Sequence, residues 1–229
     1  MFTPEGAVVL GKLLDGFVLN LQIFVITLIG SLPLGLIIMF GSRSRLGIRV
    51  FGRMFRPIQL LTRGFVWVIR GTPLMLQLIF VFYGPGLMGL PPIKSRVTAT
   101  LVTFIINYAA YFSEIFRGGI DSIPQGQYEA GQVLGMTKRQ VFFKVVLLQV
   151  VKRVTPSVGN EIITLVKDTS LSRIISVTEI LFVADNYTRQ GLLWQLFTTA
   201  IVFLIFNGLW TLALGCIERK RDFFRARGG

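Results

Sequence analysis

The sequence predicts an all-α protein, a polytopic bundle of about five membrane-spanning helices. Hydrophobic residues make up 52% of the 229 residues and charged residues only 15%, against about 25% charged residues in soluble domains. The apolar residues come in runs about as long as the roughly 20 residues that a helix needs to cross a bilayer. The 24 lysines and arginines lie between these runs, which is typical of a membrane protein and argues against a nucleic-acid partner.

Five apolar runs qualify as spans, and two of them are interrupted. The first and last runs contain no charge, and the third contains only Glu114 near its end. The second run contains Arg63 and Arg70, and the fourth contains Glu161, so we expect both to be broken or extended by interfacial pieces. The predicted spans, which form a single transmembrane domain over residues 1–229, are 17–40, 58–83, 97–116, 154–172 and 192–217.

The basic residues predict the orientation. With these boundaries, 18 of them fall on one side of the membrane and 6 on the other. The richer side holds the linker after the first span together with Arg63 and Arg70 at the start of the second, the loop after the third span with the helix that follows it, and the tail. Because cytoplasmic loops carry the excess of Lys and Arg, the N-terminus is expected outside and the C-terminus in the cytoplasm. Opposite ends require an odd number of spans, which agrees with five.

Several kinds of site are excluded by composition. The chain has one cysteine, Cys216, and no histidine, which leaves no disulfide within the chain, no Cys/His zinc site and no His-based triad. Residues 6–13 match most of a P-loop, but Leu13 stands where Ser or Thr would bind Mg²⁺. The N-terminus lacks the basic region of a signal peptide, so the first span is expected to be retained. We predict neither catalytic nor metal-binding residues.

Ionisable residues at membrane depth cost roughly 2.5–3.5 kcal/mol on insertion scales, and function is their default interpretation. Glu161 is the clearest example because it lies between Val158 and Ile162. Pro156 and Gly159 precede it and predict an irregular or kinked helix. Irregular backbone at this depth is tolerated only beside protein or a wet cavity. The sequence therefore predicts that Glu161 lines a substrate cavity.

A second group of candidate substrate residues lies in the third span. Asn107, Tyr111 and Glu114 are spaced i, i+4 and i+7, which places them on one helix face. Two alternatives stay open: Glu114 pairs with Arg117 three residues on, and the amide and phenol make interhelical hydrogen bonds. Together with Glu161, these groups suit a cationic ligand that also forms hydrogen bonds. We expect a basic L-amino acid such as arginine, lysine or histidine.

A polar loop, residues 121–137, follows the third span on the basic side. It contains Pro124 and Gly126 and then becomes compatible with a helix. A short polar helix at this place has no lipid to face, so it is either an ordinary cytoplasmic loop or a docking site for a soluble partner.

The loop resembles the EAA signature of ABC importer permeases. It reads GQYEAGQVLG from Gly126, and Gly135 falls six residues after Glu129, as that signature requires. Two positions depart from it: Gly131 replaces an alanine, and Leu148 replaces the usual closing proline. Three further stretches resemble the polar amino acid permeases, in the right order: RGTPL at 70–74, SEIFRGGI at 113–120 and GNEIITLVKDTSL at 159–171.

The resemblance implies a type I importer permease fold and a set of partners. It implies a second permease copy or homologue, cytoplasmic ATPase subunits that bind ATP and Mg²⁺, an extracytoplasmic amino-acid-binding protein, and a bacterial inner membrane. This chain itself would hold no cofactor. The residues that the resemblance assigns to coupling with the ATPase are Tyr128, Glu129, Ala130, Gly131, Leu134 and Gly135. For Lys167–Ser170 it implies a gate or structural role, whereas a local charge pair that caps the span is the simpler interpretation.

Two other classes of function stay open. A membrane enzyme would need a nucleophile or paired carboxylates at depth, and Glu114 with Glu161 is the one such pair in the sequence. A channel-like protein or a secondary transporter for small cationic solutes would need no docking loop and usually shows repeats or more spans. Copurification of an ATPase discriminates the permease from both.

Overall fold

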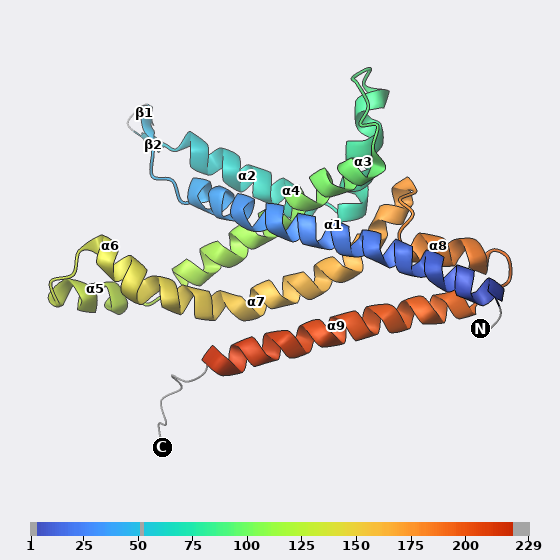
Figure 1. Ribbon diagram of the computed structural model, residues 1–229. Coiled ribbons are helices and arrows are strands. Elements are labelled where there is room, and N and C mark those ends of the chain that lie inside the picture. The colour runs from blue at the N-terminus through green and yellow to red at the C-terminus, as the bar shows by residue number, and fades with distance from the viewer. Residues whose placement is uncertain (1–3, 51–52, 222–229) are drawn as a thin grey trace.

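Long helices that run side by side form most of the molecule (Figure 1). This computed structural model describes residues 4–50 and 53–221. The helices in chain order are α1 (Pro4–Ser42), α2 (Pro57–Gly71), α3 (Leu74–Leu87), α4 (Arg96–Asp121), α5 (Gln125–Val133), α6 (Lys138–Val141), the π-helix η1 (Phe142–Val146), α7 (Leu147–Asp168), the 3₁₀-helix η2 (Thr169–Ile175), α8 (Ile180–Thr188) and α9 (Trp194–Arg221). Strands β1 (Ile48–Val50) and β2 (Arg53–Phe55) pair in antiparallel orientation.

Within residues 4–50 and 53–221, three helices are long and apolar enough to cross a membrane, and they cover the first, third and fifth predicted runs. They are Gly6–Ser42, Arg96–Asp121 and Trp194–Ile217. In α1, Thr27 and Ser31 are fully buried, whereas Ile29 and Ile37 are 68% and 67% exposed. Polar groups inside and apolar groups outside are what lipid surroundings favour. The protein is thus a multi-pass, all-α membrane protein, and the total of five spans stays a prediction.

The second predicted run is broken between α2 and α3. The two helices meet at a bend of 104°, and Figure 1 shows α3 projecting away from the long helices. Pro73 holds the preceding Thr72 in an extended conformation (φ −118°, ψ 143°), which ends α2. The Gln77 amide donates to the freed carbonyls of Ile69 (2.7 Å) and Thr72 (3.1 Å). Membrane protein backbone that leaves a helix needs such partners.

Helix α4 lies at the centre of the bundle. Its side chains Phe104, Tyr108 and Phe112 are at most 1% exposed and pack against apolar residues of α1, α3, α7 and η2. On another face of α4, Ala109 and Ala110 pack in a cluster with Val66 of α2, so α4 lies between α2 and α7.

Helix α7 corrects part of one prediction. The sequence predicts an irregular or kinked helix at Pro156 and Gly159. Helix α7 is α-helical across both residues, and the irregular turn is the π-helix η1 before it, whereas a kink at Pro156 stays a prediction. A Cβ at position 159 would lie 2.7 Å from Leu214 of α9, so Gly159 serves the close packing of two helices. Among the described residues, α7 does not reach the apolarity of the three candidate spans.

A buried polar cluster joins α1 to the segment after α7. The Asn20 amide donates to Thr169 Oγ1 (2.9 Å) and Glu179 Oε2 (3.2 Å), and its oxygen accepts from the backbone NH of Ile180 (3.1 Å). Glu179 also caps α8 by accepting from the NH groups of Leu181 and Phe182. Burial raises the pKa of the Glu179 carboxyl, and these donors oppose the rise. The cluster fixes the position of η2 and α8 against α1.

The two ends of the bundle differ. One end holds the β1–β2 hairpin, α5, α6 and the end of α9, and the other holds the start of α1 and α8 (Figure 1). We call the first the basic end, because the linker and the loop that predict the orientation lie there, as does the end of α9, from which the tail continues. Arg225 and Arg227 of the tail lie outside the described residues.

Candidate functional site

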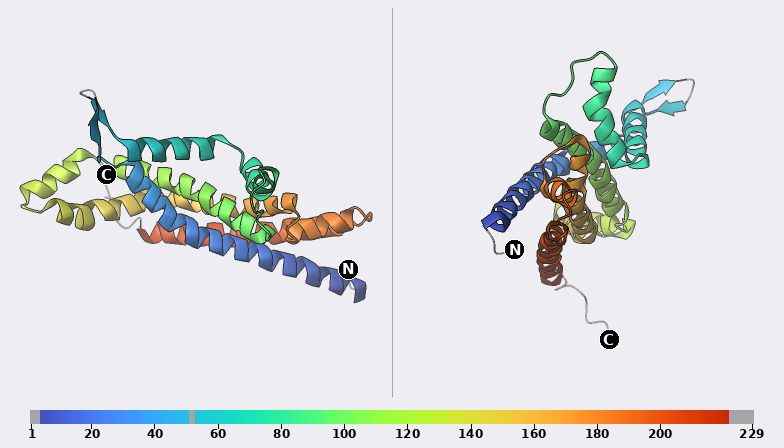
Figure 2. Two further views of the ribbon diagram at one scale, coloured as in Figure 1. Left: turned by 90° about the horizontal axis from the view of Figure 1, so that it is seen from above. Right: turned by 90° about the vertical axis from the view of Figure 1, so that its right-hand side faces the viewer.

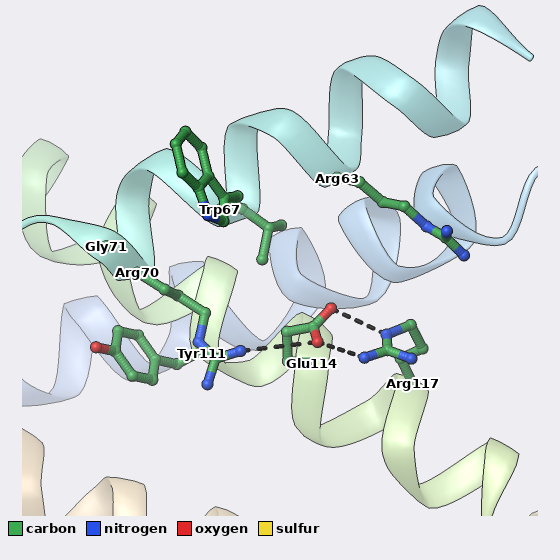
Figure 3. A pocket seen from close by; sticks show the side chains of 8 residues that line it. Arg63, Trp67, Arg70, Gly71, Tyr111, Glu114 and Arg117 are labelled. Carbon is green, nitrogen blue, oxygen red and sulfur yellow. Dashed lines mark hydrogen bonds and ion pairs between the residues drawn. The ribbon is translucent and has the colours of Figure 1, made fainter.

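Two adjoining cavities lie between α2, α4 and α7. The first, here the basic cavity, has a volume of about 550 Å³ and is lined by Arg63, Val66, Trp67, Arg70, Gly71, Tyr111, Glu114 and Arg117 (Figure 3). The second, here the acidic cavity, measures about 380 Å³ and is lined by Arg70, Gly71, Thr72, Pro73, Leu74, Asn107, Tyr108, Tyr111, Glu161, Thr164 and Asp168. Arg70, Gly71 and Tyr111 belong to both walls, so the cavities share a boundary.

The structure brings the four predicted substrate residues to these cavities. Asn107, Tyr111 and Glu114 lie along one face of α4, as their spacing predicts: Asn107 faces the acidic cavity, Glu114 the basic cavity, and Tyr111 both. Glu161 comes from α7 and faces the acidic cavity. Their location supports a ligand-binding role, which stays a prediction.

Glu114 is surrounded by arginines. Its carboxylate accepts from Arg117 Nε (3.0 Å) and Nη2 (2.5 Å), and Arg70 Nη1 lies 3.7 Å from Oε2. Figure 3 shows both guanidinium groups pointing at this carboxylate. The predicted alternative, a pair with Arg117, is therefore present. With Arg63 also in the wall, three cations face one carboxylate, and the cavity suits an anionic group.

Arg70 connects the two cavities. It is the penultimate residue of α2, just before the break, and its Cζ lies 5.0 Å from the centre of the Tyr111 ring. A guanidinium over an aromatic face at this distance is a cation–π contact. The contact orients the guanidinium at the shared wall, within reach of a ligand in either cavity.

The acidic cavity has the opposite charge balance. Glu161 is half-buried there and makes no ion pair or side-chain hydrogen bond with any residue of 4–50 or 53–221. Asp168, seven residues on, accepts a 2.7 Å hydrogen bond from the Tyr108 hydroxyl. Two carboxylates therefore face Arg70 alone among the cations of the lining, and the cavity suits a cationic group.

Asn107 also makes an interhelical hydrogen bond, which is the alternative that the sequence predicts for its amide. Its amide donates to Gln77 Oε1 at 3.0 Å, and the same Gln77 binds the carbonyls at the α2–α3 break. Asn107 thereby helps to position the break beside the acidic cavity.

Sequence reasoning missed Arg63, Arg70, Tyr108 and Asp168 as cavity residues. It counted the two arginines toward membrane orientation, assigned no cavity role to Tyr108, and gave Asp168 either a gate or structural role or a charge pair that caps the span. Asp168 instead binds Tyr108 across the bundle. For Arg63, Arg70 and Asp168 the sequence contains a usable signal, because an ionisable residue inside a predicted span is a functional candidate wherever it occurs.

The polar loop at 121–137 forms α5 at the basic end. Gly135 has φ +74°, the left-handed conformation that favours glycine. Its NH donates to the carbonyl of Gln132 (2.9 Å) and the NH of Met136 to that of Gly131 (3.0 Å). This pair of hydrogen bonds is a Schellman motif, which ends α5 with a left-handed residue at position 135. The position of Gly135, six residues after Glu129, is therefore where α5 must end.

Packing against α6 accounts for Gly131, one of the two departures from the EAA signature. A Cβ at position 131 would lie 2.5 Å from Val141 Cγ2, and Val141 is buried. An alanine at position 131 would therefore require α5 and Val141 of α6 to move apart. The helix is held further by a hydrogen bond from Gln149 of α7 to Gln127 Oε1 (2.9 Å).

The outer surface of α5 is left uncovered. Glu129 and Ala130 are exposed, and the apolar side chains Val133 and Leu134 are 87% and 78% exposed. Tyr128 is half-buried against the apolar cluster beneath. Packing holds α5 in one orientation, and its C-terminal end exposes two large apolar side chains to solvent. Such a surface is suited to docking another protein.

Ion pairs connect the basic cavity to the segment that precedes α5. Arg117, which pairs with Glu114, also reaches Asp121 at 3.2 Å, and Asp121 pairs with Arg43 at the end of α1. The last residue of α4 is therefore tied both to the cavity and to α1.

Comparison with known proteins places the chain among transport components. The family described as "Binding-protein-dependent transport system inner membrane component" matches residues 31–223. The L-cystine transport system permease protein TcyB of Bacillus subtilis (strain 168) is 37% identical over 177 residues, 75% of this chain and 74% of that protein. The arginine transport system permease protein ArtQ of the same organism is 34% identical over 211 residues, 91% of each.

A solved structure gives the same result for the fold. The crystal structure described as that of an amino acid ABC transporter with histidines superposes with a TM-score of 0.82 at 26% identity, over 96% of this chain and 100% of that chain. This chain therefore has the fold of such a permease.

Proposed function

The chain belongs to the family of binding-protein-dependent transport system inner membrane components, and we propose that it imports basic L-amino acids. Its relatives are permeases of amino acid transporters, so this chain is the membrane-spanning subunit of an ABC importer for amino acids. The finer assignment, to arginine, lysine or histidine, depends on the charge of the acidic cavity.

The observation that carries this assignment is the unpaired carboxylate of Glu161. A basic amino acid has two cationic groups and one carboxylate. The acidic cavity offers Glu161 and Asp168 to the cations, and Arg70 at the shared wall offers two N–H donors to the carboxylate. Charge-assisted hydrogen bonds of this kind are roughly twice as strong as neutral ones. A neutral amino acid would leave one of these two half-buried carboxylates without a cationic partner.

The energy source in this proposal is ATP hydrolysis on a separate cytoplasmic chain, which binds the ATP and Mg²⁺. The exposed surface of α5, formed by Glu129, Ala130, Val133 and Leu134, is the proposed docking site. Closure of the ATPase would shift the bundle between inward and outward openings, provided that it binds the two states with different affinity. The proposed further partners are a second permease copy or homologue and an extracytoplasmic amino-acid-binding protein, in a bacterial inner membrane.

Transport by the reconstituted complex tests the substrate and the energy source together. Proteoliposomes that contain the chain and its copurified subunits are expected to take up radiolabelled arginine or lysine only when ATP is supplied on the side of α5. A preference for glutamine or cystine would reject the basic substrate. Uptake that proceeds without ATP would reject the importer and favour the secondary transporter for cationic solutes.

Leu134→Glu tests the docking site. A charge at the centre of an apolar contact is expected to lower copurification of the ATPase and ATP-driven uptake at least tenfold. Leu87→Glu is the matched control, because it introduces the same charge at an exposed leucine (87%) at the end of α3, outside the EAA signature. Equal losses in both variants would show that α5 has no special role.

A further inference from the structure

A third hollow lies at the start of α2 and shares Arg63 with the basic cavity. It has a volume of about 350 Å³ and is lined by Met54, Phe55, Arg56, Gln59, Leu60 and Arg63. Strand β2 forms one side and the first turns of α2 the other, and Figure 2 shows the β1–β2 hairpin beside α2 at the edge of the bundle. We call it the hairpin pocket.

The two arginines of the hairpin pocket form no direct ion pair in the part of the chain that the structure describes, although Arg63 also faces the Glu114 carboxylate across the basic cavity. Neither Arg56 nor Arg63 makes an ion pair or a side-chain hydrogen bond with residues 4–50 or 53–221. By contrast, Arg43 close by pairs with Asp121. Two unpaired guanidinium groups facing one hollow suit the oxygen atoms of a phosphate, which arginine binds through two parallel N–H donors.

The surroundings of the pocket are apolar as well as basic. Leu46, Met54, Leu60 and Leu61 are between 60% and 72% exposed. The pocket also lies just beyond Ser42, where the first long apolar helix ends. A basic and apolar surface at the end of a transmembrane helix is what the headgroup region of a membrane contacts.

We propose that the hairpin pocket binds the phosphate of an anionic phospholipid. Arg56 and Arg63 hold the phosphate, and Met54, Phe55 and Leu60 lie against the start of an acyl chain. The apolar half of the lining favours a lipid over free inorganic phosphate, which has nothing to place there. Because Arg63 also lines the basic cavity, an occupied pocket shares one cation with that cavity.

Lipid retention by the purified full-length chain, with its copurifying subunits, tests the proposal. Native mass spectrometry would count bound phosphatidylglycerol and phosphatidylcholine over a range of lipid concentrations, with inorganic phosphate as a third probe. We expect one phosphatidylglycerol per chain, and apparent affinity about fivefold weaker in Arg56→Gln, as for one basic residue at an anionic membrane surface. Arg45→Gln is the matched control, since Arg45 is exposed in the same linker but does not line the pocket.

Leu60→Gln separates the two sources of phosphate. It is expected to weaken phosphatidylglycerol binding and to leave any competition by inorganic phosphate unchanged. Three results would overturn the proposal: equal losses in Arg45→Gln and Arg56→Gln, displacement of the lipid by equimolar inorganic phosphate, or no preference for phosphatidylglycerol over phosphatidylcholine. Uptake by the variants in phosphatidylcholine vesicles verifies that they are folded.

Discussion

Glu114 and Glu161 are both carboxylates within largely apolar helices, and both face cavities beside Arg70. Glu114 contacts two guanidinium groups, with Arg117 bound through two N–H donors. Glu161 has no such partner among the described residues and shares its cavity with Asp168. The same side chain is therefore neutralised in the basic cavity and available in the acidic one. The packing of α2 and α7 around α4 therefore decides which carboxylate can bind a cationic ligand.

The largest effect is expected from Glu161→Gln. The variant removes the one unpaired carboxylate of the acidic cavity, at a cost of about 1.5–3 kcal/mol for a charged hydrogen bond. The half-saturation concentration for arginine should rise on the order of tenfold to a hundredfold, with little change for glutamine. Uptake and substrate-stimulated ATPase activity of the reconstituted complex measure it.

The control for this variant is Asp15→Asn, which makes the same chemical change at an exposed residue of α1 that lines neither cavity. If both variants transport arginine as the wild type does, Glu161 is not a ligand, and the proposed difference in function between Glu114 and Glu161 is rejected.

Arg70→Met is expected to have the next largest effect, of a different kind. It removes the cation at the shared wall, which we expect to bind the carboxylate common to all amino acids. Half-saturation concentrations should therefore rise about tenfold for arginine and glutamine alike, as for the loss of roughly 1.4 kcal/mol. Competition uptake assays measure both ligands at once.

For Arg70→Met, Arg45→Met is the matched variant outside the cavities. A rise confined to basic amino acids would contradict the role given to Arg70, because it would mean that the guanidinium acts on the side chain of the ligand.

Tyr108→Phe should have a smaller effect. It removes the hydroxyl that donates to Asp168 and leaves a half-buried carboxylate without its donor, at a cost of about 1–2 kcal/mol in stability. We expect lower thermal stability and a change of only a few-fold in the half-saturation concentration for arginine.

Thermal unfolding of the purified complex distinguishes Tyr108→Phe from Tyr111→Phe. The Tyr111 hydroxyl makes no hydrogen bond within the described residues, and its ring contact with Arg70 would remain. Equal stability of the two variants would mean that the Tyr108–Asp168 bond contributes nothing.

The smallest effect on affinity is expected from Glu114→Gln. Its carboxylate is already occupied by Arg117 and Arg70, so arginine uptake should change less than about threefold. The loss of these contacts should instead lower the unfolding midpoint by roughly 2–4 °C for each 1 kcal/mol lost. If Glu114→Gln lost as much arginine selectivity as Glu161→Gln, the proposal that only the acidic cavity binds the cationic groups of the ligand would be rejected.

Much of the local structure could be predicted from the sequence. Apolar runs of spanning length predict α1, α4 and α9, because each of these helices satisfies its own backbone hydrogen bonds in lipid. The 3.6-residue period places Asn107, Tyr111 and Glu114 on one face of α4 without knowledge of any neighbour. Likewise, the Gly135 that ends α5 is a local requirement, since φ +74° is strained for other residues. Membership of the permease family, inferred from motifs, is confirmed by the comparisons.

Only the tertiary structure decided the partners of the charged residues. The 104° break at Thr72–Pro73 lets the end of α2 lie beside α4, which brings Arg70 to Tyr111 and Glu114. Asp168 meets Tyr108 across 60 residues of chain, and Gly159 meets Leu214 of another helix. Electrostatic and packing energies depend on distances between side chains that are remote in sequence. The local pattern therefore determined which residues are ionisable at depth, and the packing of the helices determined which of them are left unpaired.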